Sequence, residues 1–518
     1  MGIECSVVIP VFNRGDALAA GAESLRAQTI GADNLQIIYV DDGSNDGRTP
    51  GLLDDLVAGM PNATVFHEPP SGSPGRPRNV GLHHARGEFV FFSDHDDWFE
   101  PEALEAMVGY ARANNSDVVI GKVVAHGRRT VIPRLFRQSR AQIDATEAMI
   151  SLTPHKLFRR ELLATHAITY PEGKRRLEDH VFVTHAYLHA RTISVYADRI
   201  CYHHNHPGEA ANFSQTVSDP KLYSDSNLEV VELIRRHVDD PDRRDALVTR
   251  PLRHELLKKA VLTSGTPPDP AAAAHKHHVH RSALLAIDSP GAIDRLGAFS
   301  RATAKALLDD DPEAVARVGA HAAGMSLRAA PRRITKAGAV WTIEFEATVV
   351  HDKQPVMFHK VAEHSWRLDD AALPAADTDR PEREADLLNL DLEILLASRA
   401  TSEQWHLPAS YDVALRPARP RRFGTSAPSP AILTITGTTT VDLANVGGRQ
   451  IGFGTWDIVL RTDTLGVELG NRFVPDASGR GGLPRHRLTD PAARARMIVT
   501  ERRRSLAIVV KPAADGNG

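Results

Sequence analysis

The segment SDHDDW places three carboxylates within four residues, at Asp94, Asp96 and Asp97, directly after an apolar run. Like charges this close repel one another, and a bound cation relieves that repulsion. Oxygen ligands select hard cations, so the segment predicts a Mn²⁺ or Mg²⁺ site that leaves room for substrate phosphates. The alternative is a helix N-cap formed by Asp97 or Glu100, which accounts for one carboxylate of the three.

Polar segments also follow two other apolar runs, as PVFNR at Pro10 to Arg14 and VDDGSND at Val40 to Asp46. In an open parallel sheet, ligands bind beyond the carboxyl ends of the strands, so these segments are candidates for the same site. Two phosphate-binding patterns are absent from the sequence, G-x-G-x-x-G after the first run and G-x-x-x-x-G-K-[ST]. Their absence weighs against an NAD enzyme and against a P-loop protein.

The elements that must position these residues are short apolar runs that alternate with helix-like stretches. The expected strands are Cys5 to Pro10, Leu35 to Asp41, Thr64 to His67, Glu88 to Ser93 and Val118 to Val123. The expected helices include Asp16 to Gln28, Gly51 to Met60 and Pro101 to Asn114. This alternation favours a doubly wound, mostly parallel α/β sheet that is covered on both faces.

After the α/β region, the pattern of apolar residues changes twice along the chain. Residues 221–324 are Ala-rich with amphipathic pieces such as NLEVVELIRRH, which predicts a helical connector. Later segments such as WTIEFEATVV have a period of two, which is typical of all-β sandwich domains. The similar segments SYDVAL and TWDIVL lie about 45 residues apart, which favours two tandem sandwiches. We therefore expect domains at 1–220, 221–324, 325–422 and 423–518.

Two segments outside the α/β region predict a candidate metal site and a contact between protomers. The stretch 271–280 holds four histidines and predicts either a metal-binding tract or an exposed loop between helices. These histidines are His275, His277, His278 and His280. The run WDIVLRTDTLGVEL is long enough for strand pairing between protomers, so we expect a homo-oligomer.

Composition excludes several classes of protein. The 518 residues hold 62 Lys+Arg and 65 Asp+Glu, a net charge of −3 that gives no overall field for binding nucleic acid. The two cysteines, Cys5 and Cys201, predict buried free thiols and a reducing compartment. The N-terminus lacks a signal-peptide pattern and no apolar stretch is long enough for a transmembrane segment, so we expect a cytoplasmic protein that can act peripherally at the inner membrane face.

Five segments, in this order and spacing, resemble the family 2 glycosyltransferases of GT-A fold over about the first 215 residues. They are SVVIPVFNR, IIYVDDGSNDG, RPRNVGLHHARGEFVFFSDHDDW, HKLFRREL and LEDHVFVTHAY. The helical connector and sandwich tail are similar to those of the wall teichoic acid sugar transferases. The resemblance implies an α/β GT-A (Rossmann-like, mostly parallel sheet) catalytic domain. It also implies metal-dependent inverting transfer from a nucleotide sugar, most commonly a UDP-sugar.

The resemblance also assigns donor-binding residues. It places the base and ribose of the nucleotide at Pro10, Val11, Asn13 and Asp42. Asp94 and Asp96 match the outer positions of the D-x-D motif, which hold the metal on the pyrophosphate; the middle residue is His95, where Ser is usual. Arg78 is similar to the arginine near the D-x-D carboxylates and the diphosphate, although a helix-surface role is the alternative.

The pair Glu178 and Asp179 matches the position of the catalytic base in inverting members. Such a transfer needs one carboxylate to take the proton of the acceptor hydroxyl while the metal stabilises the departing diphosphate. Without the resemblance, the pair is an ordinary acidic helix start. His203 or His206 is expected beside the leaving group, with core or loop histidines as the alternative.

The resemblance does not identify the acceptor. Basic residues beside the expected base predict an anionic acceptor such as a polyol-phosphate polymer, unless they are solvated loop charges. They are Lys174, Arg175 and Arg176, with a second group at Arg128, Arg129, Arg134, Arg137 and Arg140. By resemblance to the teichoic acid transferases, the oligomer is expected to be a trimer.

The sequence argues against two other functions. A sugar nucleotidyltransferase would carry a Gly-rich loop where this chain has IPVFNRGD. A carbohydrate-binding protein with an inactive transferase domain would not need Asp96 and Asp179, which are both present.

Overall fold

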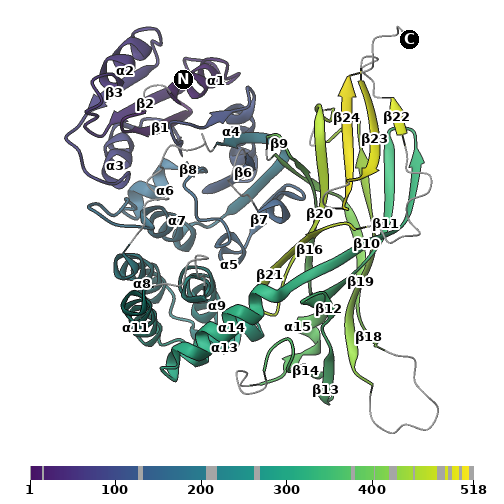
Figure 1. Cartoon of the computed structure of the whole chain (residues 1–518). Helices are drawn as coiled ribbons and strands as arrows, with labels where there is room; N and C mark the ends of the chain where they lie inside the picture. Colours follow the sequence, from purple (N-terminus) through teal and green to yellow (C-terminus); the bar gives the residue numbers. More distant parts are fainter. Residues whose placement is uncertain are drawn as a thin grey trace. The chain divides into compact units, whose positions relative to one another are not determined.

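The computed structural model covers the chain in two compact units, Met1–Pro251 and Leu252–Gly518, and each is considered by itself (Figure 1). The residues that the structure describes are 2–14, 17–125, 132–205, 219–261, 269–374, 380–401, 403–418, 429–446, 450–474, 485–487, 493–500 and 504–512.

The first unit is built on a nine-stranded sheet with the order β3-β2-β1-β4-β8-β6-β9-β5, in which β7 also pairs with β9. The strands are β1 (Cys5–Val11), β2 (Leu35–Asp41), β3 (Ala63–His67), β4 (Phe89–Phe92), β5 (Trp98–Phe99), β6 (Val118–Ala125), β7 (Arg140–Ile143), β8 (Leu157–Arg159) and β9 (Ile193–His204). Most paired residues lie in the parallel pairs β1–β2, β2–β3, β1–β4 and β6–β9, while β8 runs antiparallel to both of its neighbours. The predicted mostly parallel α/β fold is confirmed.

Helices connect these strands along the chain. They are α1 (Leu18–Arg26), α2 (Thr49–Ala58), α3 (Gly75–His84), α4 (Ala103–Ala113), the 3₁₀ helix η2 (Pro133–Phe136), α5 (Ala145–Ala148), α6 (Arg160–Thr165), α7 (Glu178–His189), α8 (Pro220–His237) and α9 (Pro241–Arg250). The unit therefore extends past the expected boundary at residue 220, because α8 packs against α7 and α9 against α8. Of the eight helical segments described in the expected connector, α8 and α9 thus belong to the α/β unit.

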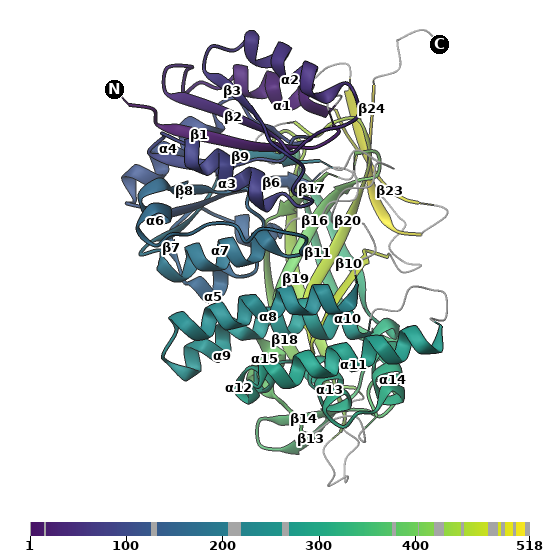
Figure 2. The ribbon, with the colours of Figure 1, turned by 90° about the vertical axis from the view of Figure 1, so that its left-hand side faces the viewer.

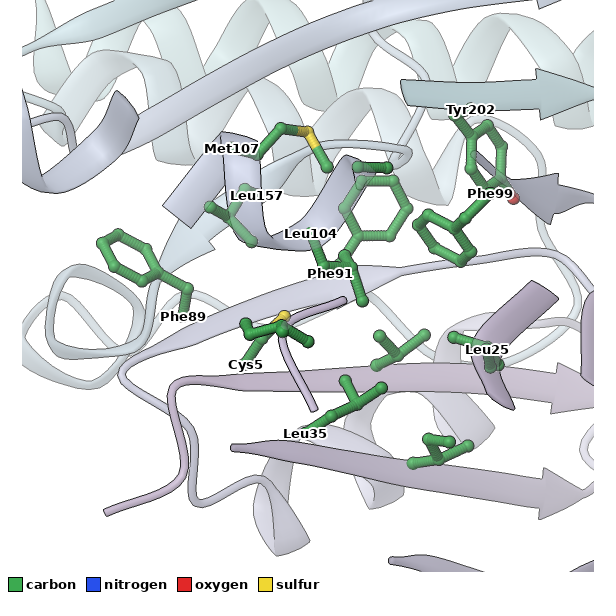
Figure 3. Close-up of a cluster of buried hydrophobic side chains, with 14 of the residues drawn as sticks. Cys5, Leu25, Leu35, Phe89, Phe91, Phe99, Leu104, Met107, Leu157 and Tyr202 are labelled. Atoms are coloured by element: carbon green, nitrogen blue, oxygen red, sulfur yellow. The ribbon is translucent and has the colours of Figure 1, made fainter. Parts of the chain in front are cut away.

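The core of the first unit is apolar on both sides of the central strands, since every residue of β1, β2 and β4 is buried. Figure 3 shows part of this core, where Phe91, Phe99 and Tyr202 pack together above β1. Cys5 and Cys201 are both buried free thiols, as predicted. Burial raises the pKa of Cys201 to about 12 and that of Cys5 further, so neither thiol ionises near neutral pH.

The second unit begins with helices and continues into antiparallel sheets. Its helices are the π-helical turn η4 (Pro251–Leu257), α10 (Lys258–Val261), α11 (Pro270–Ile287), α12 (Pro290–Asp294), α13 (Ala298–Leu308) and α14 (Pro312–Gly324). Figure 2 shows α11 and α13 side by side, and the two helices are in contact. The four histidines of the 271–280 stretch lie on α11, so the expected loop is wrong. Asp269 caps this helix and Pro270 begins it, which explains why an Ala-rich stretch folds as helix here.

Two sheets follow. One contains β10 (Met325–Ala337), β11 (Val340–His351), β12 (Gln354–Pro355), β13 (Phe358–Ala362), β14 (Ser365–Leu368), β15 (Glu382–Arg383), β18 (Ala409–Pro417) and β19 (Ala431–Asp442). The other contains β16 (Asp391–Ser398), β17 (Gln404–Leu407), β20 (Gly454–Thr464), β21 (Val467–Arg472), β22 (Arg485–Arg487), β23 (Ala493–Val499) and β24 (Leu506–Pro512). The short helix α15 (Glu384–Leu388) lies between β15 and β16 in the chain.

The chain passes from the first sheet to the second at β16, returns to the first at β18, and enters the second again at β20. This path differs from the expected tandem sandwiches, in which one sandwich would be complete before the next began. The expected boundary at 422/423 falls between β18 and β19, yet these strands pair along their length. The strand in WDIVLRTDTLGVEL is β20, and β16, β21 and β24 already pair with it. This strand is therefore not the edge that we expected to join protomers. A period of two predicts strands but does not specify their partners.

Among the residues that the structure describes, none of the helices combines the length and the hydropathy that crossing a membrane requires.

Candidate active site

The polar segments singled out in the sequence lie at one edge of the first sheet. Parallel pairing sets Val11 beside Asp41, at the carboxyl ends of β1 and β2. It also sets Val8 beside Phe92, so the carboxyl end of β4 reaches the same edge. The backbone N–H of Asp42 donates to the carbonyl of Val11 at 2.9 Å, which ties the first two loops together.

The expected nucleotide-binding residues are already ordered by contacts within the chain. Pro10 and Val11 are buried in β1. Asp42 is buried, and its two oxygens accept from the N–H and the hydroxyl of Ser71, both at 2.9 Å. Burial raises the pKa of Asp42, although these hydrogen bonds oppose the rise. Asn13 has a φ of 51° and its amide group exchanges two hydrogen bonds with Asn45.

Arg78 joins the two groups of carboxylates. Its guanidinium, only 6% exposed, donates to Asp94 Oδ1 at 3.0 Å and to Glu178 Oε1 at 3.2 Å. It also lies over the ring of Tyr170, 5.2 Å from the ring centre. Helix α3 carries Arg78 close to β1, since a Cβ on Gly81 would stand 2.3 Å from the Val8 side chain. Arg78 is thus buried inside the site, and the alternative of a helix-surface arginine is wrong.

Asp94 contacts two basic side chains, Arg78 and His155. His155 Nε2 lies 3.2 Å from Asp94 Oδ2, on the opposite side from the Arg78 contact. Burial alone would raise the pKa of Asp94, but His155 and Arg78 outweigh it and hold that pKa well below its usual range. Asp97 behaves oppositely, because burial and the charges of Asp94 and Asp96 raise its pKa well above the usual range.

Two carboxylate oxygens in this segment are buried without a hydrogen bond among the described residues, Asp96 Oδ2 and Asp97 Oδ2. Such an oxygen is costly to bury, and a bound cation would compensate for it. One ligand atom each of Asp94, Asp97, His155 and His204 lie within 4.8 Å of one another. The donor set therefore fits a divalent cation, although this group includes Asp97 where we expected Asp96.

The middle residue of the motif, His95, is partly buried. Burial lowers the pKa of His95, while the neighbouring charges of Asp96 and Asp94 oppose that effect.

Glu178 and Asp179 begin helix α7, and the residue before them is in an uncommon conformation. Leu177 has a φ of 56°, the left-handed region that costs a non-glycine residue roughly 1–2 kcal/mol. Burial raises the pKa of Asp179 and of Glu178, and Arg78 opposes both shifts. Asp179 Oδ1 accepts from the N–H of His180 at 2.9 Å. Asp179 is partly buried, and a carboxylate with a raised pKa suits proton acceptance near neutral pH.

The structure separates the histidines of the Tyr202–His206 stretch. His203 stacks on Trp98 with ring centres 5.0 Å apart, and its Nε2 lies 2.7 Å from Glu100 Oε1. His204, which we did not predict, faces the Asp94 group instead, together with His155. Neighbouring residues of a strand point to opposite faces, so His204 shares the face of Tyr202, whose hydroxyl accepts from the N–H of Asp94. His206 lies outside the described residues.

The expected acceptor residues differ in exposure. Lys174 is exposed, whereas Arg175 pairs with Glu229 of α8 and Arg176 is buried. In the second basic group, Arg140 pairs with Glu147 at 2.5 Å, and Arg128 and Arg129 lie outside the described residues. Arg134 and Arg137 are described, and each makes a contact within the chain.

Comparison with known proteins agrees with this geometry. Residues 6–167 match the description "Glycosyl transferase family 2". This part of the chain thus matches a family 2 glycosyltransferase domain. The match spans β1 to α6 and therefore includes Arg78, the Asp94 segment and His155.

Two relatives align with the chain over part of their length. The poly(ribitol-phosphate) beta-glucosyltransferase of Bacillus spizizenii is 35% identical over 204 residues, which are 39% of this chain and 32% of the relative. The poly(ribitol-phosphate) beta-N-acetylglucosaminyltransferase TarS of Staphylococcus aureus is 29% identical over 251 residues, which are 48% of this chain and 44% of TarS. The matched part is thus less than half the length of each relative.

Solved structures share the fold. S. aureus TarS 1-349 in complex with UDP-GlcNAc has a TM-score of 0.57 at 22% identity, covering 66% of this chain and 96% of that one. The longer S. aureus TarS structure has a TM-score of 0.54 at 18% identity, covering 98% of this chain and 85% of that one. The likeness therefore extends to the antiparallel sheets of the second unit.

Proposed function

We propose that this chain is an inverting glycosyltransferase that moves a sugar from a UDP-sugar to a hydroxyl group of a polyol-phosphate polymer. The observation that carries the proposal is the position of Arg78, which contacts Asp94 of the expected donor site and Glu178 of the expected base pair. Inverting transfer needs such an arrangement, since the nucleotide leaves on one side of the sugar and the acceptor attacks from the other. The names of the relatives support the donor and acceptor classes.

Each group of residues then has a role. The loops after β1 and β2, with Pro10, Val11, Asn13 and Asp42, take the nucleotide base and ribose. Asp94 and Asp96 hold Mn²⁺ or Mg²⁺, a cation that would neutralise charge on the diphosphate. The buried Asp96 oxygen without a partner in the described part of the chain supports this fit, and Asp97, His155 and His204 are close enough to complete the ligand set.

Asp179 accepts the proton of the attacking hydroxyl, with Glu178 beside it. The paired Arg78 keeps Glu178 in place, and burial raises the pKa of Asp179 toward the working pH of a base. Arg78 is close enough to the Asp94 group to face the leaving diphosphate as well. His203 contacts Glu100 and Trp98, so His204 is the better candidate of the two for the leaving-group side.

For the acceptor, Lys174 is the residue that the structure leaves most accessible among the three expected basic residues. A lysine provides a flexible point charge for the phosphates of a polyol-phosphate chain. We also propose that the protein works on the cytoplasmic side, peripherally at the membrane, and that it forms a homo-oligomer such as a trimer. Because β20 is an interior strand, the contact between protomers must use another surface than the one we expected.

The test is hydrolysis and transfer of UDP-sugars by the purified full chain with Mn²⁺ present. We expect activity that excess EDTA abolishes and that Asp96→Ala removes while circular dichroism stays unchanged. The exposed Asp33→Ala variant is the matched control and should keep full activity. Full activity in EDTA would contradict the metal assignment. Binding of UDP-sugar without any turnover would favour the carbohydrate-binding alternative.

A further inference from the structure

A group of histidines lies at the end of helix α7 that is away from Glu178. His185 and His189 are one turn apart on α7, and His237 is the last residue of α8. One ring nitrogen of each lies within 4.8 Å of the others. The ring centres are 5.0 Å apart for His185 and His189, 5.2 Å for His185 and His237, and 4.6 Å for His189 and His237.

The surroundings of His185 and His189 favour the neutral form of imidazole. Burial, together with the neighbouring histidines, lowers the pKa of His185 to about 4, and burial also lowers the pKa of His189. Neutral imidazole is the ligand form of histidine, so no proton has to leave these two rings at neutral pH before a cation binds.

The two helices add a favourable field. Helix α7 ends at His189 and α8 ends at His237, so two helix C-termini meet at the histidine group. The C-terminus of a helix carries a partial negative charge, which stabilises a cation beside it. The nearby Arg236 is held along α8 by Glu232 at 3.1 Å.

We propose that His185, His189 and His237 bind one divalent transition-metal cation, with Zn²⁺ as the best match. Two histidines four residues apart on a helix place two nitrogens on one face, and a third nitrogen from a neighbouring helix completes a three-histidine site. Zn–N bonds of about 2.0 Å need nitrogens about 3.3 Å apart, so small ring rotations close the site around the metal. The three side chains are half-buried or exposed, which leaves a route for the ion and a position for water.

This site is separate from the carboxylate group of the proposed active site. Asp179 and His189 are ten residues apart on α7, which is about 15 Å at the rise of an α-helix. The group at the end of α7 offers imidazole ligands alone, which favour borderline cations such as Zn²⁺, whereas the active-site group combines carboxylates with two histidines.

The cation would fasten α7 to α8. Helix α8 also holds the segment that leads into α7, because the Ser226 hydroxyl accepts from the N–H of Arg176 at 3.2 Å and Glu229 pairs with Arg175. A metal bound by the three histidines would also join the C-terminal ends of α7 and α8. His166 also packs at this end of α7, since it stacks on His189 with ring centres 4.0 Å apart.

The experiment is titration of the full chain with Co²⁺, using protein prepared without a histidine tag and with the active-site cation removed by Asp96→Ala. Co²⁺ replaces Zn²⁺ and absorbs visible light strongly when a protein site holds it with low coordination number. We expect one Co²⁺ per chain with such bands, displacement by Zn²⁺, and a melting temperature raised by several degrees with Zn²⁺ compared with EDTA.

The bands and the Zn²⁺-dependent shift should disappear in His189→Ala and in His237→Asn, and should persist in the exposed control His359→Ala. If His189→Ala does not fold, His237→Asn decides, since that residue is an exposed helix end. Bands that survive His237→Asn, or their absence in the unaltered histidine site, would overturn the proposal. The readouts are optical and thermal, so they do not depend on whether the chain transfers sugars.

Discussion

The two ends of helix α7 carry opposite kinds of chemistry. At the start, Glu178 is a buried carboxylate paired with Arg78, and Asp179 beside it is partly buried. At the end, His185 and His189 are half-buried imidazoles next to His237. This order follows the helix dipole, which favours negative groups at the N-terminus and cations at the C-terminus. One helix thus supports a base at one end and a candidate metal site at the other.

Burial has opposite consequences at these ends. It raises the pKa of the carboxyl groups and lowers the pKa of His185 and His189, because in both cases it disfavours the charged form. Arg78 opposes the rise in pKa of both carboxyl groups, so their arrangement depends on this partner. For His185 and His189, the neutral form is favoured by burial itself. The start of α7 should therefore tolerate substitution poorly and its end should tolerate it well.

The largest effect is expected on stability, from Arg78→Met. This change leaves Glu178 and Asp94 without their buried cation, and breaking a buried ion pair costs about 3–5 kcal/mol. Urea unfolding monitored by circular dichroism measures the loss. The matched control is Arg76→Met, two residues earlier, whose pair with Glu68 is about one-third exposed and should contribute less than about 1 kcal/mol. Equal losses in the two variants would contradict the role given to Arg78.

Next in size is the loss of turnover in Asp179→Asn. The amide keeps the shape but cannot accept the proton, so turnover should fall by about 10²-fold or more while UDP-sugar binding persists. His189→Ala, at the other end of the same helix, should change turnover far less. Rates with saturating UDP-sugar and calorimetric donor binding test both variants. If the Asn variant binds donor and turns over normally, the base lies elsewhere.

A smaller effect is expected in the pH dependence of kcat/KM. The pKa of Asp179 is raised by burial, and a base is lost when the pH falls through its pKa. The acid limb of the profile should therefore lie above the value of about 4 for an ordinary carboxyl group. Because Glu178 interacts with Asp179, the limb reports the pair. An acid limb at about 4 would mean that the acting carboxylate is solvated.

The smallest effect concerns the acceptor. Lys174→Ala should raise the apparent KM for a polyol-phosphate acceptor a few-fold and leave the donor KM unchanged, because one exposed lysine interacts with a phosphate through a screened charge. Added salt should weaken the difference between variant and parent. The control is Lys221→Ala, an exposed lysine at the start of α8. An unchanged acceptor KM at low salt would place the acceptor elsewhere.

The residue pattern was enough to predict β1, β2, β3, β4 and β6 of the first unit, the helices α1, α2 and α4, and the motifs at the carboxyl edge of the sheet. Apolar runs of β-branched and aromatic residues can only be buried in a covered sheet, so β1, β2 and β4 lie where they were expected, within one or two residues. The motif residues Asp94, Arg78 and Glu178 do meet, because parallel strands bring their carboxyl ends to one edge.

The side chains that face each other could be identified only once the packing of distant segments was known. The period of a strand separates His203 from His204 but does not say which of them faces Asp94. The pairing of Ala409–Pro417 with Ala431–Asp442, and of Asp391–Ser398 with Gly454–Thr464, joins strands whose alternating patterns would suit other partners equally well. The histidines of α7 and α8 meet because two helices pack together with their ends aligned. Local periodicity fixes a residue's face, whereas its neighbour depends on the packing of distant segments.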